Sequence, residues 1–466
     1  MNTQINNYGA NTLSNTTRNN VFVTKVKKYL KTTPGKILIA SIATIIVAIF
    51  MSTIIYSNYK STRQAVQTVG KDTVPSIIAA EHIRATLADA NSNAMNALMT
   101  KEKDNGRYWT AYRKEMNEAH SQLIDASENI TYGNEERDPI QKIMSKISEY
   151  EFVLGKARLT TATNVAGDFA EANKIMSEGI LPAASDLDKA NYSHLDSIYS
   201  SHKVKSGFLN FVLIGVVAIA MIAILWAQRF LYKKTKRILN IGFTAALVLT
   251  FIFGCYSFGV IQVVQNDLKV AKEDAFDSVH NLWKARAISY DGNADESMYL
   301  LYSGNKQQQE ASLKAFNDKE NQITSVDSEQ ALLLVKQNKS FKGFLGDELT
   351  NITFNGEKDA AMEALKYWDE YIKMDAKFRS LENDGHHDEA VKLCTGTNQG
   401  ESDWLFNKFD SALGKTLDIN QHQFDSHIDS AFSALNVFPF ILGAYLILFI
   451  VAIFLGVKPR LDEYKF

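Results

Sequence analysis

The sequence contains only two cysteines in 466 residues. Cys255 lies within a long apolar run and Cys394 lies in a polar segment, so a membrane would separate them. A disulfide requires two Cα atoms within about 7 Å of each other. We therefore expect no intramolecular disulfide. The polar segments must be stable through packing alone, which is feasible for segments of about 150 residues.

The sequence also lacks the motifs of the common enzyme classes. It has no Gly-x-Ser-x-Gly motif, no phosphate-binding loop and no kinase signature. It has neither His-Glu-x-x-His nor Cys-x-x-Cys, and its adjacent histidines, His386 and His387, lie in a polar loop. We therefore predict a non-enzymatic protein with no catalytic residues, no metal site and no cofactor.

Charged residues and histidine are absent from four long segments, residues 37–56, 208–227, 238–261 and 437–457. A helix needs about 20 apolar residues to cross the hydrocarbon core of a bilayer. The sequence therefore predicts four transmembrane helices embedded in a lipid bilayer.

The distribution of lysine and arginine predicts the orientation of these spans. Residues 1–36, 228–237 and 458–466 together carry 14 cations and two acids, a net charge of +12. The two long segments, 57–206 and 265–436, hold 36 cations and 50 acids, a net charge of −14. Cytoplasmic flanks are enriched in lysine and arginine. We therefore expect both termini to be cytoplasmic in a bacterial cell membrane, and the acidic outer surface argues against nucleic-acid binding.

The predicted domain order alternates membrane spans with outer segments. It comprises a cytoplasmic tail (1–36), a span (37–56), an outer bundle (57–206), a span (207–227), a basic cytoplasmic turn (228–237), a span (238–264), a second outer bundle (265–436), a span (437–457) and a cytoplasmic tail (458–466).

Helical periodicity predicts the structure of the outer segments. Apolar residues recur at spacings of three and four, as in Ile140, Ile143, Ile147, Tyr150 and Leu154. Glycine- and asparagine-rich breaks separate these stretches. The fold class is therefore an all-α membrane protein, with a four-helix bundle in the first outer segment and a helical bundle in the second. We expect the halves to share architecture without strong residue identity. Internal pairing of the bundles and homodimerisation both stay open.

The densest polar cluster of the second outer segment provides a candidate ligand- or partner-binding site. It consists of Asp291, Asn293, Asp295 and Glu296, and helical spacing places Asp291 and Asp295 on one face. The functional hypothesis is a contact site for a cation or a ligand amino group, and the alternative is a solvated helix face. A second stretch, residues 351–357, has the pattern of a turn followed by a helix start, and capping explains it without a function.

The short cytoplasmic segments cannot fold into a signalling domain, so any output must pass to a separate protein. We predict an inner docking surface, although the positive-inside rule alone also accounts for the basic turn. Its residues are Arg229, Lys233, Lys234, Lys236, Arg237, Arg460, Asp462 and Glu463.

Four stretches resemble motifs of actinobacterial four-span membrane proteins, the GlnX-like family. They are residues 180–184, 284–297, 351–357 and 459–464, and the resemblance extends over most of residues 140–466. The resemblance implies a relay that passes aspartate or glutamate availability from an extracytoplasmic amino-acid-binding lipoprotein to a PknG-type serine/threonine kinase. The predicted outer bundles also resemble the ligand-binding domains of chemoreceptors in shape.

Three functional classes follow. The leading hypothesis is a non-enzymatic transmembrane sensor that relays a signal. The alternative is a structural membrane scaffold or envelope protein without a ligand. A transporter component is the third class, and the spans disfavour it because they contain no ionisable residue.

Overall fold

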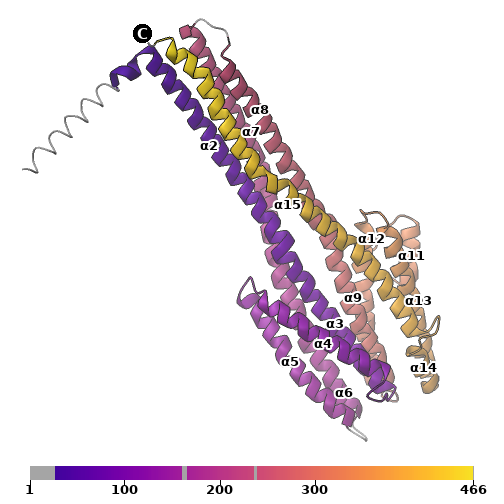
Figure 1. Cartoon of the computed structure of the whole chain (residues 1–466). Helices are drawn as coiled ribbons and strands as arrows, with labels where there is room; N and C mark the ends of the chain where they lie inside the picture. The colour runs from indigo at the N-terminus through magenta and orange to yellow at the C-terminus, as the bar shows by residue number, and fades with distance from the viewer. Residues whose placement is uncertain (1–26, 160–164, 236–238, 465–466) are drawn as a thin grey trace, which may run out of the picture. The chain divides into compact units, whose positions relative to one another are not determined.

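The computed structural model describes residues 27–159, 165–235 and 239–464 (Figure 1). Within these ranges every assigned element is helical, as the periodicity predicts. The chain divides into two compact units. We call residues 1–64, 201–265 and 431–466 the apolar unit, and residues 65–200 and 266–430 the bundle unit.

Within the described ranges, four helices are long and apolar enough to cross a membrane, which confirms the predicted number of apolar helices. They are α2 (Thr33–Gln67), α7 (Leu181–Thr235), α8 (Ile241–Lys269) and α15 (Ser402–Asp462). All four extend past the residue at which the two units divide, so each helix contributes residues to both units.

Within the apolar unit, α8 and α15 approach each other closely at two glycines. A Cβ atom built on Gly242 would lie 2.2 Å from the carbonyl oxygen of Ala452, and one on Gly456 would lie 3.0 Å from the Cα atom of Gly242. Asn240 donates a hydrogen bond to the carbonyl oxygen of Gly456 at 2.7 Å. Small residues allow helix backbones to pack closely in a membrane, and these glycines have that role here.

The bundle unit contains two successive sets of helices (Figure 1). The first set is η1 (Thr68–Thr73), α3 (Val74–Met99), α4 (Arg107–Glu128), α5 (Asn134–Leu159), α6 (Val165–Lys174), η2 (Ile175–Ile180) and the start of α7. The second set is η3 (Val270–Phe276), α9 (Asp277–Leu301), α10 (Lys306–Ile323), α11 (Ser328–Lys336), α12 (Phe344–Thr350), α13 (Glu357–Asn383), α14 (His387–Cys394) and the start of α15.

The predicted helix breaks are confirmed. Gly133, Gly304 and Gly356 lie between helices with φ values of 68°, 84° and 85°. Glycine adopts this left-handed conformation without the penalty that a Cβ atom imposes. Each of these turns therefore reverses the chain at a position where the sequence contains glycine.

The two sets of helices contact each other within the bundle unit through part of the hydrophobic core, while most buried residues of the second set form two further clusters. The structure thus shows internal packing of the two bundles, and homodimerisation stays a prediction. Ala294 and Met298 of α9, together with Tyr302 directly after this helix, belong to the core cluster that includes α3, α4 and α5. Helix α3 packs along α9. The two bundles are therefore halves of one compact unit and pair within a single chain.

The first helices of the two sets are related in sequence as well as in position. Residues 84–91 read Arg-Ala-Thr-Leu-Ala-Asp-Ala-Asn, and residues 286–293 read Arg-Ala-Ile-Ser-Tyr-Asp-Gly-Asn, so four of eight positions are identical. The π-helical segments η1 and η3 precede these helices at the same register. The expected architectural repeat thus includes a short stretch of sequence similarity, and we call the two sets repeat 1 and repeat 2.

The repeats also share a loop. Residues 129–132 read Asn-Ile-Thr-Tyr and residues 351–354 read Asn-Ile-Thr-Phe. In repeat 1 the carboxylate of Glu136 accepts hydrogen bonds from two backbone amides of this loop at 2.6 Å each. In repeat 2 Glu357 does the same at 2.7 and 2.9 Å. The turn followed by a helix start that the sequence predicts for residues 351–357 is thus present, and Glu357 holds the preceding loop, whereas Gly356 at the N-cap of α13 provides no side-chain cap.

A tyrosine that contacts the first helix completes the correspondence. Tyr150 and Tyr371 each follow the capping glutamate by fourteen positions. The Tyr150 hydroxyl donates to the Asn91 side-chain oxygen at 3.2 Å. In repeat 2 the Asn293 amide donates to the Tyr371 hydroxyl at 3.3 Å. The identical asparagines therefore contact the corresponding tyrosine in both repeats, with the tyrosine as donor in repeat 1 and the asparagine as donor in repeat 2.

Candidate functional site

The structure places the predicted polar cluster on α9, largely inside the bundle unit. Asp291 and Asp295 lie on one helix face as predicted, and both pair with the Lys319 ammonium group, at 2.9 and 2.5 Å. Burial raises the pKa of Asp295 to about 7, although Lys319 lowers it. A cation of the protein itself therefore already occupies this pair of acids.

Asn293 and Glu296 point into a different network. The Tyr371 hydroxyl donates to Glu296 at 2.5 Å, and the Asn293 amide donates to Glu296 at 3.1 Å. Burial raises the pKa of Glu296 well above its ordinary value. Asn293 and Asp295 are each 5% exposed and Glu296 is 0% exposed. The alternative of a solvated helix face is therefore wrong for these three residues.

A cavity of about 280 Å³ opens between the two repeats. Of the four predicted residues, Asn293 lines it, and the other three do not. The Asn293 side-chain oxygen accepts a hydrogen bond from Ser92 and another, at 3.4 Å, from Asn96, and both donors lie on α3. The lining residues are Asp89, Ser92, Asn93, Asn96, Arg107, Tyr108, Ala111, Tyr290, Asn293, Thr397, Asp403, Phe406 and Asn407.

Two of the charged groups in this cavity pair with each other. The Arg107 guanidinium lies 3.1 Å from the Asp403 carboxylate, and the Tyr108 hydroxyl donates to the same carboxylate at 2.6 Å. Burial raises the pKa of Asp403 to about 6 despite these partners. Arg107 also donates to the carbonyl oxygen of Thr395. This side of the cavity is therefore locally neutral.

Asp89 has no such partner. Its carboxylate accepts a hydrogen bond from Asn93 at 2.6 Å, and among the described residues it forms no ion pair. Arg286, the nearby cation of α9, is held by Asp410 at 2.7 and 2.8 Å. Burial raises the pKa of Asp89 well above its ordinary value, and Glu115 adds to that effect. Among the described residues Asp89 is therefore the acid of this cavity that forms no direct ion pair, although Arg286 and Lys114 lie near enough to lower its pKa.

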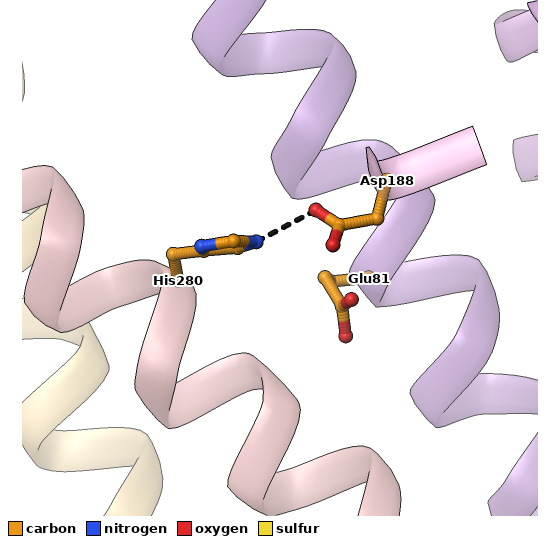
Figure 2. Close-up of side chains that lie close together, drawn as sticks. All are labelled: Glu81, Asp188 and His280. Atoms are coloured by element: carbon orange, nitrogen blue, oxygen red, sulfur yellow. Dashed lines mark hydrogen bonds and ion pairs between the residues drawn. The ribbon is translucent and has the colours of Figure 1, made fainter. Parts of the chain in front are cut away.

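A second cluster joins the two repeats elsewhere in the unit (Figure 2). Glu81 of α3, Asp188 of α7 and His280 of α9 are all buried, and their donor atoms lie within 4.8 Å of one another. His280 Nε2 lies 2.6 Å from Asp188 Oδ1. Such a set of donors could hold a metal ion by its spacing alone.

The surrounding charges argue against a metal ion in that cluster. Lys284 lies 3.3 Å from the second Asp188 oxygen, and Arg84 lies 3.4 Å from Glu81. A divalent ion about 5 Å from a protein cation would be repelled by roughly 7 kcal/mol at an effective dielectric constant of about 20. We therefore interpret the cluster as an internal ion network in which each carboxylate already has a cation.

The predicted docking residues lie in the apolar unit. Arg229, Lys233 and Lys234 are exposed near the end of α7. Lys236 and Arg237 lie outside the described residues. At the end of α15, Arg460 is 9% exposed and its guanidinium pairs with Glu463 at 2.7 Å, while Asp462 and Glu463 are exposed. Their role in docking stays a prediction.

Residues 65–200 match the family described as an actinobacterial sensor domain. The matched range coincides with the first half of the bundle unit. No curated protein and no solved structure matched the chain. Together with the four apolar helices, the match supports an actinobacterial multi-pass membrane protein with a sensing role.

Proposed function

We propose that the protein is a non-enzymatic transmembrane sensor that detects an extracytoplasmic solute and relays its presence to a cytoplasmic protein. The observation that supports this most directly is the cavity between the two repeats, one wall of which belongs to the range that is similar to the sensor-domain family. Pockets lined by a few convergent polar groups are the usual binding sites of small ligands.

A solute bound between repeats can change their packing because the cavity has lining residues on α3, α4, α9 and α15. Helix α15 continues from that cavity into the apolar unit, and α3 follows α2 through η1. A ligand that prefers one of two helix arrangements shifts the population towards it. We propose that the shift is transmitted along these helices as a small displacement.

The finer proposal follows the resemblance to GlnX-like proteins. In this proposal an amino-acid-binding lipoprotein presents aspartate or glutamate availability to the bundle unit, and a PknG-type kinase receives the signal. The kinase would dock on the exposed cations Arg229, Lys233 and Lys234 and on the C-terminal group around Arg460.

An affinity pull-down of the full-length protein from native membrane, read by mass spectrometry, tests this proposal. Recovery of a binding lipoprotein and a cytoplasmic kinase would support the relay. Recovery of neither, with intact protein in hand, would contradict it and favour a structural scaffold. The matched variant carries Arg460→Ala, Asp462→Ala and Glu463→Ala together, and we expect it to retain membrane insertion while losing the kinase.

A further inference from the structure

The repeat relates Asp89 to Asp291, the sixth residue of the shared eight-residue stretch. In repeat 2 the Asp291 carboxylate lies 2.9 Å from the Lys319 ammonium group on α10. In repeat 1 the Asp89 carboxylate has no ion pair among the described residues and faces the cavity. The corresponding carboxylates therefore differ, since Asp291 pairs with a lysine and Asp89 lines a cavity.

The helices that pack on these carboxylates explain the difference. Helix α4 packs on α3 as α10 packs on α9. The charged groups of α4 that act on Asp89 are Glu115 and Lys114. The Lys114 ammonium group lies 2.8 Å from the Glu115 carboxylate and forms no ion pair with Asp89 among the described residues. In α10, by contrast, the Lys319 ammonium group pairs directly with Asp291 and Asp295.

We propose that the cavity binds a small primary amine whose ammonium group pairs with Asp89, as the Lys319 ammonium group pairs with Asp291. This proposal rests on the proposed sensor function, since it names the chemistry of the solute that the cavity receives. The site would supply a carboxylate for the charge and the side-chain oxygens of Asn93 and Tyr290 for the N–H donors. The Asn96 oxygen already accepts a hydrogen bond from Ser297 at 2.6 Å.

The remaining walls limit the size and shape of the ligand. A volume of about 280 Å³ corresponds to roughly nine water molecules at about 30 Å³ each, so a ligand of about ten non-hydrogen atoms or fewer fits. The aromatic rings of Tyr108, Tyr290 and Phe406 line the cavity. Such rings attract a cation through their negative faces. Arg107 and Asp403 neutralise each other, so the net charge that a ligand must balance comes from Asp89.

Four probes with one carbon skeleton distinguish the possible ligand classes. They are butylamine, 4-aminobutyrate, butyrate and 1-butanol, added at millimolar concentration to the full-length protein in lipid nanodiscs. Hydrogen exchange of α3 and α9 reports binding. We expect butylamine to protect both helices, and butyrate and butanol to leave them unchanged. Protection by 4-aminobutyrate would show that the site also accepts a carboxylate.

Two variants assign the effect to the cavity. Asp89→Asn keeps the shape of the side chain and removes the charge, and we expect at least about tenfold weaker binding. Asp291→Asn is the matched control, because that carboxylate pairs with Lys319 and does not line the cavity. We expect it to bind butylamine as the wild type does. Asn407 is an exposed residue of the lining, so Asn407→Trp should also weaken binding without affecting the fold.

Two outcomes would overturn the amine assignment. One is equal protection by butyrate or butanol, and the other is no protection by butylamine in wild-type protein. Either result would leave the sensor proposal standing if the pull-down recovers its partners. If butylamine binds but the pull-down recovers neither partner, the relay proposal is contradicted and the amine-binding site still stands.

Discussion

Asp188 of repeat 1 accepts a hydrogen bond from His280 of repeat 2 at 2.6 Å, and the two residues are 92 positions apart. Lys284 reaches the other oxygen of the same carboxylate at 3.3 Å. Burial pushes the pKa of Asp188 upward, but His280 and Lys284 outweigh it, so the pKa lies below its ordinary value. Asp188 is therefore ionised at neutral pH, and it attaches α7 to α9.

Glu81 beside this pair should make the stability of the bundle unit depend on pH. Burial raises its pKa from 4.5 to about 7, although Arg84 lowers it. Between these values the folded protein binds a proton that the unfolded chain does not. The free energy of unfolding therefore falls as pH rises from about 4.5 to about 7, by about 3 kcal/mol from this group. Glu81→Gln cannot titrate, so its stability should decline less across this range in thermal unfolding.

A matched control separates the local effect from general titration. Burial also raises the pKa of Glu320 on α10 to about 7. We expect Glu320→Gln to reduce the pH dependence of hydrogen exchange in α10, and Glu81→Gln to reduce it in α3 and α7. If Glu81→Gln has the same pH slope as the wild type, Glu81 is not the titrating group.

Amine binding should release a proton. Burial holds the pKa of Asp89 well above its ordinary value, so at pH values below that pKa the carboxyl group is protonated before an amine binds. An ammonium ligand favours the ionised form and displaces that proton. The affinity for butylamine should therefore rise with pH, by up to about tenfold per unit below the pKa of Asp89. Calorimetry in two buffers of different ionisation enthalpy measures the released proton, and the same heat in both buffers would contradict this linkage.

The sequence was sufficient for the apolar helices and for most helix boundaries. Four segments without charge predicted four membrane-compatible helices, and Gly133, Gly304 and Gly356 lie in turns that the sequence also predicted. These features are local, since hydrophobicity and glycine conformation depend on neighbouring residues alone. The additional helix breaks around α11 and α12 in repeat 2 were not predicted, because the sequence there has no comparably strong pattern of turn residues.

The repeat and the cavity depend on contacts between distant residues. The identical positions of the repeat are few, and loops of different length separate them. The repeat can be recognised only when the contact between Asn91 and Tyr150 is compared with the contact between Asn293 and Tyr371. Asp89 belongs to no local motif. A comparison of residues 84–91 with residues 286–293 could have found it, because the predicted residue Asp291 is its counterpart.

The shared loop should stabilise the π-helical segment η3. The Asn351 amide donates to the carbonyl oxygens of Glu273 and Asp274, at 3.3 and 3.0 Å. Because a π-helix disrupts the usual hydrogen-bond ladder, such carbonyls need other partners. We expect Asn351→Ala to cost about 1–3 kcal/mol and to speed hydrogen exchange across residues 270–276. Asn355→Ala, an exposed position in the same loop, should leave that exchange unchanged. Equal effects of the two changes would contradict the proposed role.

The close approach of α8 and α15 gives a prediction for the apolar unit. A Cβ atom on Gly242 would lie 2.2 Å from a backbone carbonyl oxygen, and backbone cannot move aside as a flexible side chain does. Gly242→Ala should therefore separate the two helices, break the bond from Asn240 to Gly456 and cost about 1–3 kcal/mol. Gly443→Ala on α15 is the control, since a Cβ atom there meets nothing within 4 Å. Thermal unfolding in nanodiscs should distinguish the two variants, and equal midpoints would show that the helices do not require this glycine.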